Sequence, residues 1–506
     1  MKRIIKNILT LGLLVYSSML LAQPGSLDTT FNGNGKILTS ISTGKDEAQD
    51  VAIQVDGKIV VAGYSSNGTN FDYVVVRYNT DGSLDNTFGT SGKLVLNISN
   101  YDMAYAVAIN TDGKIYVAGI TGAASFYGGG NFGVVRLNPN GTTDTTFGTN
   151  GVATVTFPGT DYFTNMTLQS DGKILLCGYN VVDVTGNYSD FSIARLNADG
   201  TTDFDFSNDG KNTVNFNSDD RARVMQVDAM GNIYLGGTGS SNICIVKLFS
   251  DGSIDTSYGT NGKVNTRYNT QSSNLNDMIL LDNGSIVFTG YLYSTEYEML
   301  VGKLDSSGAF DTSFGTNGAT VTDVDNNSED TAYSLVIQPD DKIIISGRSY
   351  TSGSYYFAIL RYTSSGQLDN TFSNDGKVLT AFGTSWCMGL ASALQNDGKL
   401  VVTGSYGSFN EDFATARYNT GAPLSTIDFD KNKITVFPNP TNGLLNITTS
   451  EDLIGQEYFI NDNMGRTIGK GIINFTNTSL FVNNQQSGVY FFTVPNKSIS
   501  LKFIKN

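Results

Sequence analysis

One block of sequence recurs seven times along this chain. It reads Gly-Ser-Leu-Asp-Thr-Thr-Phe at its first appearance, and the copies begin 52 to 59 residues apart, at Gly25, Gly82, Gly141, Gly200, Gly252, Gly308 and Gly366. A repeat of this length and number indicates one supersecondary unit stacked on itself. The repeat therefore limits the possible folds before any single residue is considered.

Each repeat also contains a tight turn between short apolar runs. In the first repeat Asp56-Gly57-Lys58 precedes the run 59–63, and a further run ends at Arg77-Tyr78. Asp-Gly in this setting indicates a hairpin, because a type I′ turn needs positive φ at both central positions. The runs are β-branched and aromatic, which favours strands. In the first repeat the predicted strands are 36–41, 50–55, 58–65 and 73–79.

Four-stranded units closed radially make a β-propeller, which has roughly 4–8 blades. We therefore predict an all-β chain whose residues 23–420 form a seven-bladed β-propeller. The alternative is an open β-solenoid. A solenoid needs capping repeats with a polar outer face, and neither end of this array shows one.

A charge pattern predicts how the ring closes. In six repeats a cation at the end of a strand precedes an Asp by eight residues: Arg77 and Asp85, Arg136 and Asp144, Arg195 and Asp203, Lys247 and Asp255, Lys303 and Asp311, and Arg361 and Asp369. Arg417 lacks such an Asp, whereas Asp28 lacks a preceding cation. We expect these two half-motifs to pair. A ring of ligand-binding arginines is the functional alternative, but near-identical copies favour a structural ion pair in every blade.

Composition excludes several classes of function. The chain contains no histidine, which excludes Ser-His-Asp and Cys-His catalysis and any His-ligated metal site. The formal charge of −15 makes nucleic acid an unsuitable partner. The three cysteines, Cys177, Cys244 and Cys387, lie in apolar runs and are expected to be small buried hydrophobes. We expect no catalytic residue, cofactor or metal, although the acidic stretch 323–330 is a conceivable calcium loop.

The two ends differ from the repeats. Lys2, Arg3 and Lys6 precede an apolar run, 8–21, which predicts a signal peptide over residues 1–22 rather than a membrane anchor. A polar linker, 421–433, leads to residues 434–506, whose pattern predicts a small β-sandwich. Distinctive residues there are Pro438, Asn439, Pro440, Gly443, Asp462, Gly465, Arg466, Gly488, Tyr490 and Lys505.

These motifs resemble two known families. Residues 434–506 resemble the C-terminal sorting domain of type IX secretion, through the Pro-Asn-Pro opening, the Asp-x-x-Gly-Arg turn, the Gly-Val-Tyr strand and the basic end. That resemblance implies partnership with the type IX machinery, passage through the outer membrane, and a secreted or surface location. The repeats resemble delta-60 repeats, which imply a fold and no settled activity.

A candidate ligand face follows from strand direction. Loops of variable length and content emerge on one face, and the repeated turns emerge on the other. Variable loops on a rigid scaffold often carry recognition. Aromatic residues there are candidates for binding a glycan or a protein: Phe126, Tyr127, Tyr188, Tyr293, Tyr297, Tyr350, Tyr355, Tyr356 and Phe409.

Three functions stay open. The leading hypothesis is a secreted or cell-surface, non-catalytic binding propeller. The second is a polysaccharide-active enzyme that uses paired carboxylates, drawn from Asp46, Glu47, Asp219, Asp220, Glu296, Glu298, Glu329, Asp330, Glu411 and Asp412. The third is a purely structural surface protein.

Overall fold

The computed structural model describes residues 22–126, 128–181, 188–326, 328–408, 410–421, 434–437, 440–449, 453–462, 466–482, 485–494 and 499–505. The chain divides into two compact units, Met1–Pro423 and Leu424–Asn506. All of the predicted signal peptide except Ala22 lies outside the described residues. In the described part of the chain, no helix is long and apolar enough to cross a bilayer.

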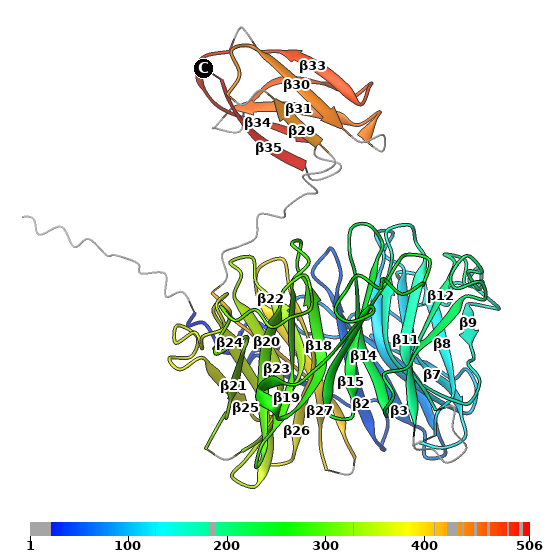
Figure 1. Cartoon of the computed structure of the whole chain (residues 1–506). Helices are drawn as coiled ribbons and strands as arrows, with labels where there is room; N and C mark the ends of the chain where they lie inside the picture. The colour runs from blue at the N-terminus through cyan, green and yellow to red at the C-terminus, as the bar shows by residue number, and fades with distance from the viewer. Residues whose placement is uncertain are drawn as a thin grey trace, which may run out of the picture. The chain divides into compact units, whose positions relative to one another are not determined.

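The first unit has a propeller-like fold of repeated four-stranded antiparallel sheets (Figure 1). Its described residues form seven such sheets. The first three are β2 (Asp46–Ile53), β3 (Ile59–Ser66), β4 (Phe71–Tyr78) and β5 (Lys93–Leu96); β6 (Tyr101–Ile109), β7 (Ile115–Ala123), β8 (Asn131–Leu137) and β9 (Val152–Val155); and β10 (Thr160–Leu168), β11 (Ile174–Val181), β12 (Ser189–Leu196) and β13 (Lys211–Val214).

Three more sheets have the same order. They are β14 (Asp220–Val227), β15 (Ile233–Gly239), β16 (Asn242–Leu248) and β17 (Lys263–Thr266); β18 (Ser272–Leu280), β19 (Ile286–Tyr293), β20 (Tyr297–Leu304) and β21 (Ala319–Thr322); and β22 (Glu329–Ile337), β23 (Ile343–Thr351), β24 (Ser354–Tyr362) and β25 (Lys377–Thr380). A short 3₁₀ turn, Tyr268–Thr270, precedes β18.

The seventh sheet joins the two ends of the array. It consists of β26 (Cys387–Leu394), β27 (Leu400–Tyr406), β28 (Asp412–Tyr418) and β1 (Lys36–Thr39). β1 runs antiparallel to β28, with Lys36 opposite Ala416 and Thr39 opposite Phe413. β2 of the first sheet packs beside β27, as Figure 1 also shows. The series of sheets therefore closes on itself, and the open solenoid is wrong.

The sheets correct the predicted strand grouping. The strand that follows each Gly-Ser-Leu-Asp block is the outer strand of the preceding sheet, so each sheet is offset from the sequence repeat by one strand. The repeated block is therefore a turn within a sheet, between its third and fourth strands, and not a connection between blades. The second predicted strand, 50–55, in fact begins at Asp46.

The structure forms all seven ion pairs named above. The cation nitrogen lies between 2.5 and 3.1 Å from an Asp Oδ2: Arg77–Asp85, Arg136–Asp144, Arg195–Asp203, Lys247–Asp255, Lys303–Asp311, Arg361–Asp369 and Arg417–Asp28. Except in Lys303–Asp311, both partners are largely buried.

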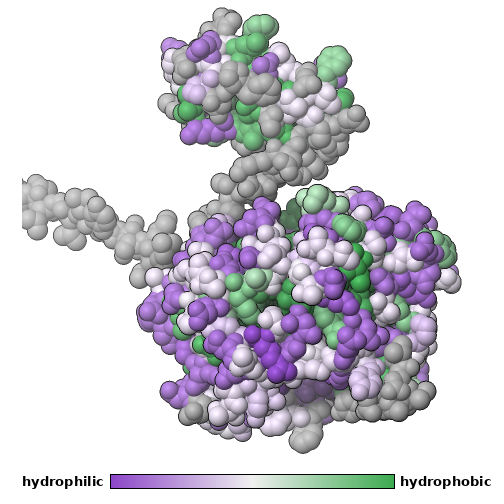
Figure 2. Space-filling view, in the orientation of Figure 1, coloured by the Kyte–Doolittle hydropathy of each residue, from purple (hydrophilic) through white to green (hydrophobic). Residues whose placement is uncertain are grey.

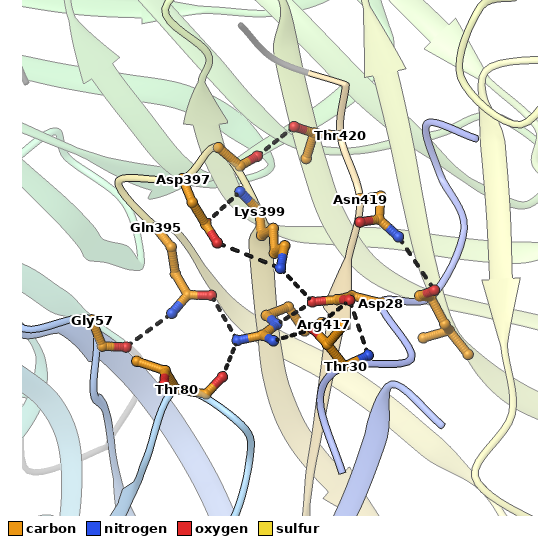
Figure 3. A network of polar contacts seen from close by, with 12 residues as sticks. Asp28, Thr30, Gly57, Thr80, Gln395, Asp397, Lys399, Arg417, Asn419 and Thr420 are labelled. Carbon is orange, nitrogen blue, oxygen red and sulfur yellow. Dashed lines mark hydrogen bonds and ion pairs between the residues drawn. The ribbon is translucent and has the colours of Figure 1, made fainter. Parts of the chain in front are cut away.

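The closing pair lies in a dense polar network (Figure 3). Arg417 Nε donates to Asp28 Oδ2 at 2.7 Å, and Lys399 Nζ lies 2.9 Å from the same oxygen. Asp28 Oδ1 accepts hydrogen bonds from the backbone N–H and hydroxyl of Thr30. Arg417 also donates to the backbone carbonyl of Thr80 in the first sheet. One carboxylate thus holds its own turn and a strand from the other end of the unit.

The described residues of the second unit form two sheets. One has the order β29 (Ile434–Phe437), β30 (Leu444–Thr449), β33 (Asn477–Phe481); the other has β32 (Thr467–Ile472), β31 (Glu457–Asp462), β34 (Gly488–Val494), β35 (Ile499–Lys505). Leu445 and Ile447 of the first sheet share one core with Ile460 and Phe492 of the second.

Several sorting-motif residues have defined contacts. Arg466 Nε donates to Asp462 Oδ2 at 2.7 Å, so the Asp-x-x-Gly-Arg turn is closed by an ion pair. The hydroxyl of Tyr490 donates to the carbonyl of Gln486 at 2.7 Å, and Gly488 lies opposite Lys505 across two strands. The Gly443 N–H donates to the Thr441 hydroxyl, and Pro440 lies just before β30. Pro438, Asn439 and Gly465 lie outside the described residues.

Replacing Asp28 should weaken the first unit. The Asp28→Asn variant leaves a buried guanidinium without its anion, so the free energy of unfolding should fall by about 1–3 kcal/mol at neutral pH in a urea titration. In the folded state the pKa of Asp28 is lowered to about 2; burial opposes the lowering, and the contacts from Lys399, Thr30 and Arg417 cause it. The wild-type advantage should therefore be lost as pH falls from about 4 to about 2.

The matched control for that variant is Arg221→Ala. Its partner is Asp219, and both side chains of this pair are nearly half exposed. Breaking it should change the free energy of unfolding by less than about 0.5 kcal/mol. Equal losses in the two variants would contradict a special role for the closing pair.

Candidate functional site

A β-bulge interrupts the first strand of every sheet in the first unit. The ladder between the first and second strands skips one residue at the same place each time. A bulge leaves one residue unpaired and re-aims its side chain. The seven skipped residues are Gln49, Tyr105, Thr164, Arg223, Asn276, Tyr333 and Leu390.

A glycine on the neighbouring strand makes each bulge possible. A Cβ on Gly119 would collide with the backbone carbonyl oxygen of Met103, just before the bulge at Tyr105. The same collision occurs at the matching glycine of each other sheet: Gly63, Gly178, Gly237, Gly290, Gly347 and Gly404. The glycine that ends each Ile-Val-Val-Ala-Gly run is therefore required by the close approach of two backbones.

The bulges surround one cavity of about 680 Å³. All seven skipped residues line it, together with residues from the first and second strands of several sheets. Six tyrosines contribute to the wall, namely Tyr105, Tyr162, Tyr179, Tyr291, Tyr297 and Tyr333. Amides and hydroxyls add to it, from Gln49, Thr164, Asn165, Thr238, Asn274, Asn276 and Thr331. The wall therefore combines flat apolar rings with many neutral hydrogen-bonding groups.

The tyrosine rings contact one another and nearby cations. The rings of Tyr162 and Tyr179 stack with centroids 4.8 Å apart, and the Arg221 guanidinium lies 5.4 Å from the centroid of Tyr179. Tyr291 packs edge-on against Tyr297 at 5.2 Å. These contacts fix the rings, so a ligand would meet a largely pre-formed surface.

Two carboxyl groups in the cavity wall join adjacent sheets. Asp50 accepts hydrogen bonds from the backbone N–H groups of Val51 and of Val107 in the next sheet. Asp277 does the same with Met278 and with Leu335 of the next sheet. Burial raises the pKa of each to about 7, and the N–H donors oppose the rise. Since each carboxyl accepts two N–H bonds, its main contribution is structural.

The nine predicted aromatic residues have different surroundings. Of the seven that the structure describes, only Tyr297 lines the cavity. Tyr350, Tyr355 and Tyr293 form aromatic contacts close to the strand ends, and Phe126 packs on Phe71 with a ring separation of 4.8 Å. Tyr188 is 56% exposed and Tyr356 is half-buried. Tyr127 and Phe409 lie outside the described residues.

Three of the predicted loop acids are fully buried. Asp46 Oδ2 accepts the backbone N–H groups of Ile41 and Ser42, Asp220 accepts that of Phe216, and Asp330 accepts that of Val324. These side chains hold the incoming connection between sheets, so their buried carboxylates have a structural role.

The remaining acids have mixed environments. Lys45 pairs with both Glu47 and Glu411, at 2.7 and 3.4 Å. Asp219 pairs with Arg221, and Glu298 accepts from Ser294. Glu329 lines the cavity. Glu296 lies just before β20 and Asp412 is the first residue of β28, and neither lines the cavity.

The stretch 323–330 and the cysteines show no reactive arrangement. In the part of the chain that the structure describes, no cluster of three His, Cys, Asp or Glu side chains is placed to hold a metal ion. All three cysteines are free and buried. Burial raises the pKa of the Cys177 and Cys244 thiols to about 12, which keeps them protonated and unreactive.

The lining of the cavity was not predicted, because the candidate ligand-binding residues were chosen from the loops. The lining comes from strands, and the predicted inner strand started at residue 50, one position after the bulge at Gln49. A signal was present. The residue three positions after Asp46, Asp102, Asp161, Asp220 or Asp330 varies from Gln to Tyr, Thr and Arg at the same point of the strand.

Comparison with known families identifies both parts of the chain. Residues 54–88, 111–147, 169–206, 231–258, 338–372 and 395–421 match a beta-propeller domain of unknown function (DUF5122). Residues 435–506 match the secretion system C-terminal sorting domain. The chain thus carries beta-propeller repeats and a type IX sorting tail, as predicted. The tail marks it for export to the cell surface or the medium and implies interaction with the secretion machinery.

Solved structures of similar shape are distant in sequence. A catalytically inactive virginiamycin B lyase from Staphylococcus aureus, crystallised with quinupristin, is 11% identical, with a TM-score of 0.43 over 75% of this chain and 98% of that one. PorZ of Porphyromonas gingivalis, a surface component of type IX secretion, is 13% identical, with a TM-score of 0.30 over 93% and 70%. Sqt1 of Chaetomium thermophilum is 13% identical, with a TM-score of 0.42 over 76% and 100%. With TM-scores this low, none of these likenesses carries an argument about function. No curated protein matches the sequence.

The raised pKa of Asp277 predicts an unusual pH trend. Between about pH 4 and about pH 7 the folded state keeps a proton that the unfolded chain has lost, so this group's contribution to stability falls as pH rises. The Asp277→Asn variant lacks that contribution. Its free energy of unfolding, relative to wild type, should therefore increase across this range and level off above it.

Urea titrations at several pH values measure this trend. Asparagine suits the position, since Asn165 occupies the matching place in the third sheet. Asp219→Asn serves as control, because the pKa of Asp219 is lowered through its contacts with Ser189 and Arg221 despite partial burial. If the difference in the free energy of unfolding between Asp277→Asn and wild type did not change with pH, the raised pKa of Asp277 would be contradicted.

Proposed function

We propose that this protein is a secreted or cell-surface binding module, whose propeller holds a glycan in the bulge-lined cavity and is delivered by its sorting tail. In this proposal residues 1–22 are a signal peptide, 23–420 a seven-bladed propeller, 421–433 a linker and 434–506 a β-sandwich sorting domain. The partners are the type IX machinery and an extracellular ligand, with no role for nucleic acid, cofactor or metal.

One observation carries the proposal. The framework repeats from sheet to sheet, including the ion pair, the Asp-Gly turn and the glycine beside the bulge, but the bulged residue differs in nearly every sheet. A position that varies inside a repeated frame is free to serve recognition. Seven such side chains converge on one cavity.

The chemistry of the wall suits a sugar. Tyrosine rings offer flat surfaces on which the apolar C–H face of a sugar ring can pack. Amides and hydroxyls offer both donors and acceptors for sugar hydroxyls. The cavity volume falls within the range of small-molecule sites, roughly 300–1,000 Å³. On the face of the first unit that Figure 2 shows, hydrophilic and near-neutral residues predominate, with smaller groups of hydrophobic residues between them.

Binding is favoured over hydrolysis by the state of the cavity carboxyls. Asp50 and Asp277 are engaged by backbone N–H groups. Glu329 is the third acid of the lining, and in the described part of the chain it is the one whose carboxyl is not held by such backbone N–H groups. A glycosidase needs two carboxyls free to face the scissile bond.

A glycan array probed with the full chain tests this proposal. We expect retention of at least one glycan without its cleavage, and about tenfold weaker retention by Tyr291→Ala. Tyr188→Ala removes an exposed tyrosine outside the cavity and should retain the glycan normally. Cleavage of the retained glycan would favour the enzyme alternative, and no retention at all would favour a purely structural protein.

Removing residues 434–506 should block export and leave the propeller folded. The two units have separate cores, and the sorting match lies only in the tail. In a host with type IX secretion, the truncated chain should stay cell-associated while its purified form unfolds cooperatively on heating. Normal amounts of truncated protein in the medium would overturn the assignment of the tail.

A further inference from the structure

Two arginines in the cavity stand apart from the other arginines. Of the ten arginines in the described residues, seven pair with an Asp: Arg77, Arg136, Arg195, Arg221, Arg361, Arg417 and Arg466. In that same part of the chain, Arg223, Arg267 and Arg348 have no carboxylate within 4.0 Å. Arg267 lies outside the cavity and donates to Asn242 and to the carbonyl of Ser240. Arg223 and Arg348 line the cavity.

Each cavity arginine is positioned by the fold. Arg223 is the bulged residue of β14, and its side chain is exposed in the cavity. Arg348 on β23 donates to the sulfur of Met388 at 3.2 Å, and its guanidinium lies 4.9 Å from the centroid of the Tyr355 ring. These contacts orient Arg348 without neutralising it, so its charge stays available.

The two guanidinium groups surround the same tyrosines. Burial raises the pKa of Tyr291 and of Tyr333, and the positive charges of Arg223 and Arg348 oppose that rise in both. Arg348 also lies 5.8 Å from the centroid of Tyr333. The fourth, fifth and sixth sheets thus give the cavity a cationic side that carries stackable rings.

A cationic side is unexpected in this protein. The formal net charge is −15, and an acidic surface repels anions. The acids that line the cavity do not cancel the two arginines, since Asp50 and Asp277 are engaged by backbone N–H groups and Glu329 forms no ion pair with Arg348 within 4.0 Å among the described residues. Unpaired guanidinium groups with planar, forked donors suit carboxylate or sulfate oxygens.

We propose that the cavity selects an acidic oligosaccharide, whose carboxylate or sulfate group is held by Arg223 and Arg348 while its rings pack on Tyr291 and Tyr333. This inference rests on the proposed function and names the ligand class. The neutral amides and hydroxyls elsewhere in the wall bind the sugar hydroxyls, and the arginines supply the preference for charge.

Calorimetry with matched probes tests the inference on the full chain. The probes are trigalacturonate, a sulfated galactose trisaccharide and neutral galactotriose. We expect an acidic probe to bind about tenfold more tightly than the neutral one, and its affinity to fall as sodium chloride rises from about 50 to about 500 mM. Comparison of the two acidic probes shows which group the site prefers.

Variants separate the proposed selection of acidic oligosaccharides from the proposed binding of glycans in general. Arg223→Gln introduces the residue that occupies the matching bulge at Gln49, so the fold already accepts it. Together with Arg348→Gln it should reduce the affinity for the acidic probe to that of galactotriose, so that the ratio of acidic to neutral affinity falls from about ten to about one. Arg223→Lys should give an intermediate affinity, and Arg267→Gln should have no effect.

The outcomes are distinct. Equal binding of acidic and neutral probes, unaffected by the arginine variants, would overturn the charge selection and leave a glycan-binding cavity standing. Binding of none of these probes, together with no retention on the glycan array, would overturn both.

Discussion

One carboxylate in each repeated turn holds the propeller together. Asp85 shows how: Oδ1 accepts two hydrogen bonds from Thr87 in its own turn, and Oδ2 contacts both Arg77 and Lys58 from two other strands. The arginine then donates to the carbonyl of Pro139 in the next sheet and packs over the Phe88 ring. The Asp therefore links local turn geometry, the order of strands within a sheet and the contact between sheets. At the ends of the array Asp28 and Arg417 perform the same linkage without a covalent neighbour.

The contact that the cation makes with the next sheet is lost in two of the sheets that line the cavity. In the fourth and fifth sheets Lys247 and Lys303 replace the arginine. Within the described residues neither lysine donates to a carbonyl of the next sheet as Arg77 and Arg417 do. A lysine has one compact charge, whereas an arginine has five donors and can serve an Asp and a carbonyl together. The same sheets supply Arg223 and Tyr291 to the cavity. Local departures from a repeated frame are expected near functional positions.

The repeated turns, ion pairs and glycines could be predicted because the same residues recur in each repeat. The lining of the cavity could not be predicted in this way, because the lining residues differ from repeat to repeat. Six ion pairs followed from a fixed spacing of eight residues, and the closing pair followed from the two unmatched half-motifs at Asp28 and Arg417. The inner strand was misplaced for a physical reason. A bulge inserts one residue, so the alternation of inward and outward side chains changes phase at that point. The apolar pattern after the bulge, from Asp50 onward, was recognised; the segment before it, from Asp46 to Gln49, was assigned to a loop.

The bulges also separate the residues that vary between sheets from those that build the frame. Many paired strand residues in this fold are buried between two sheets, so changing one of them alters core packing. A bulged residue makes no ladder pair, and its side chain lines the cavity, so the frame tolerates Gln, Tyr, Thr, Arg, Asn and Leu at equivalent places. Stability and the chemistry of the cavity wall therefore depend on different residues: the Asp, the cation and the glycine set the fold, and the bulged residues line the cavity. Arg223 and Arg348 show this difference most clearly, because among the described residues neither forms one of the ion pairs that stabilise the fold.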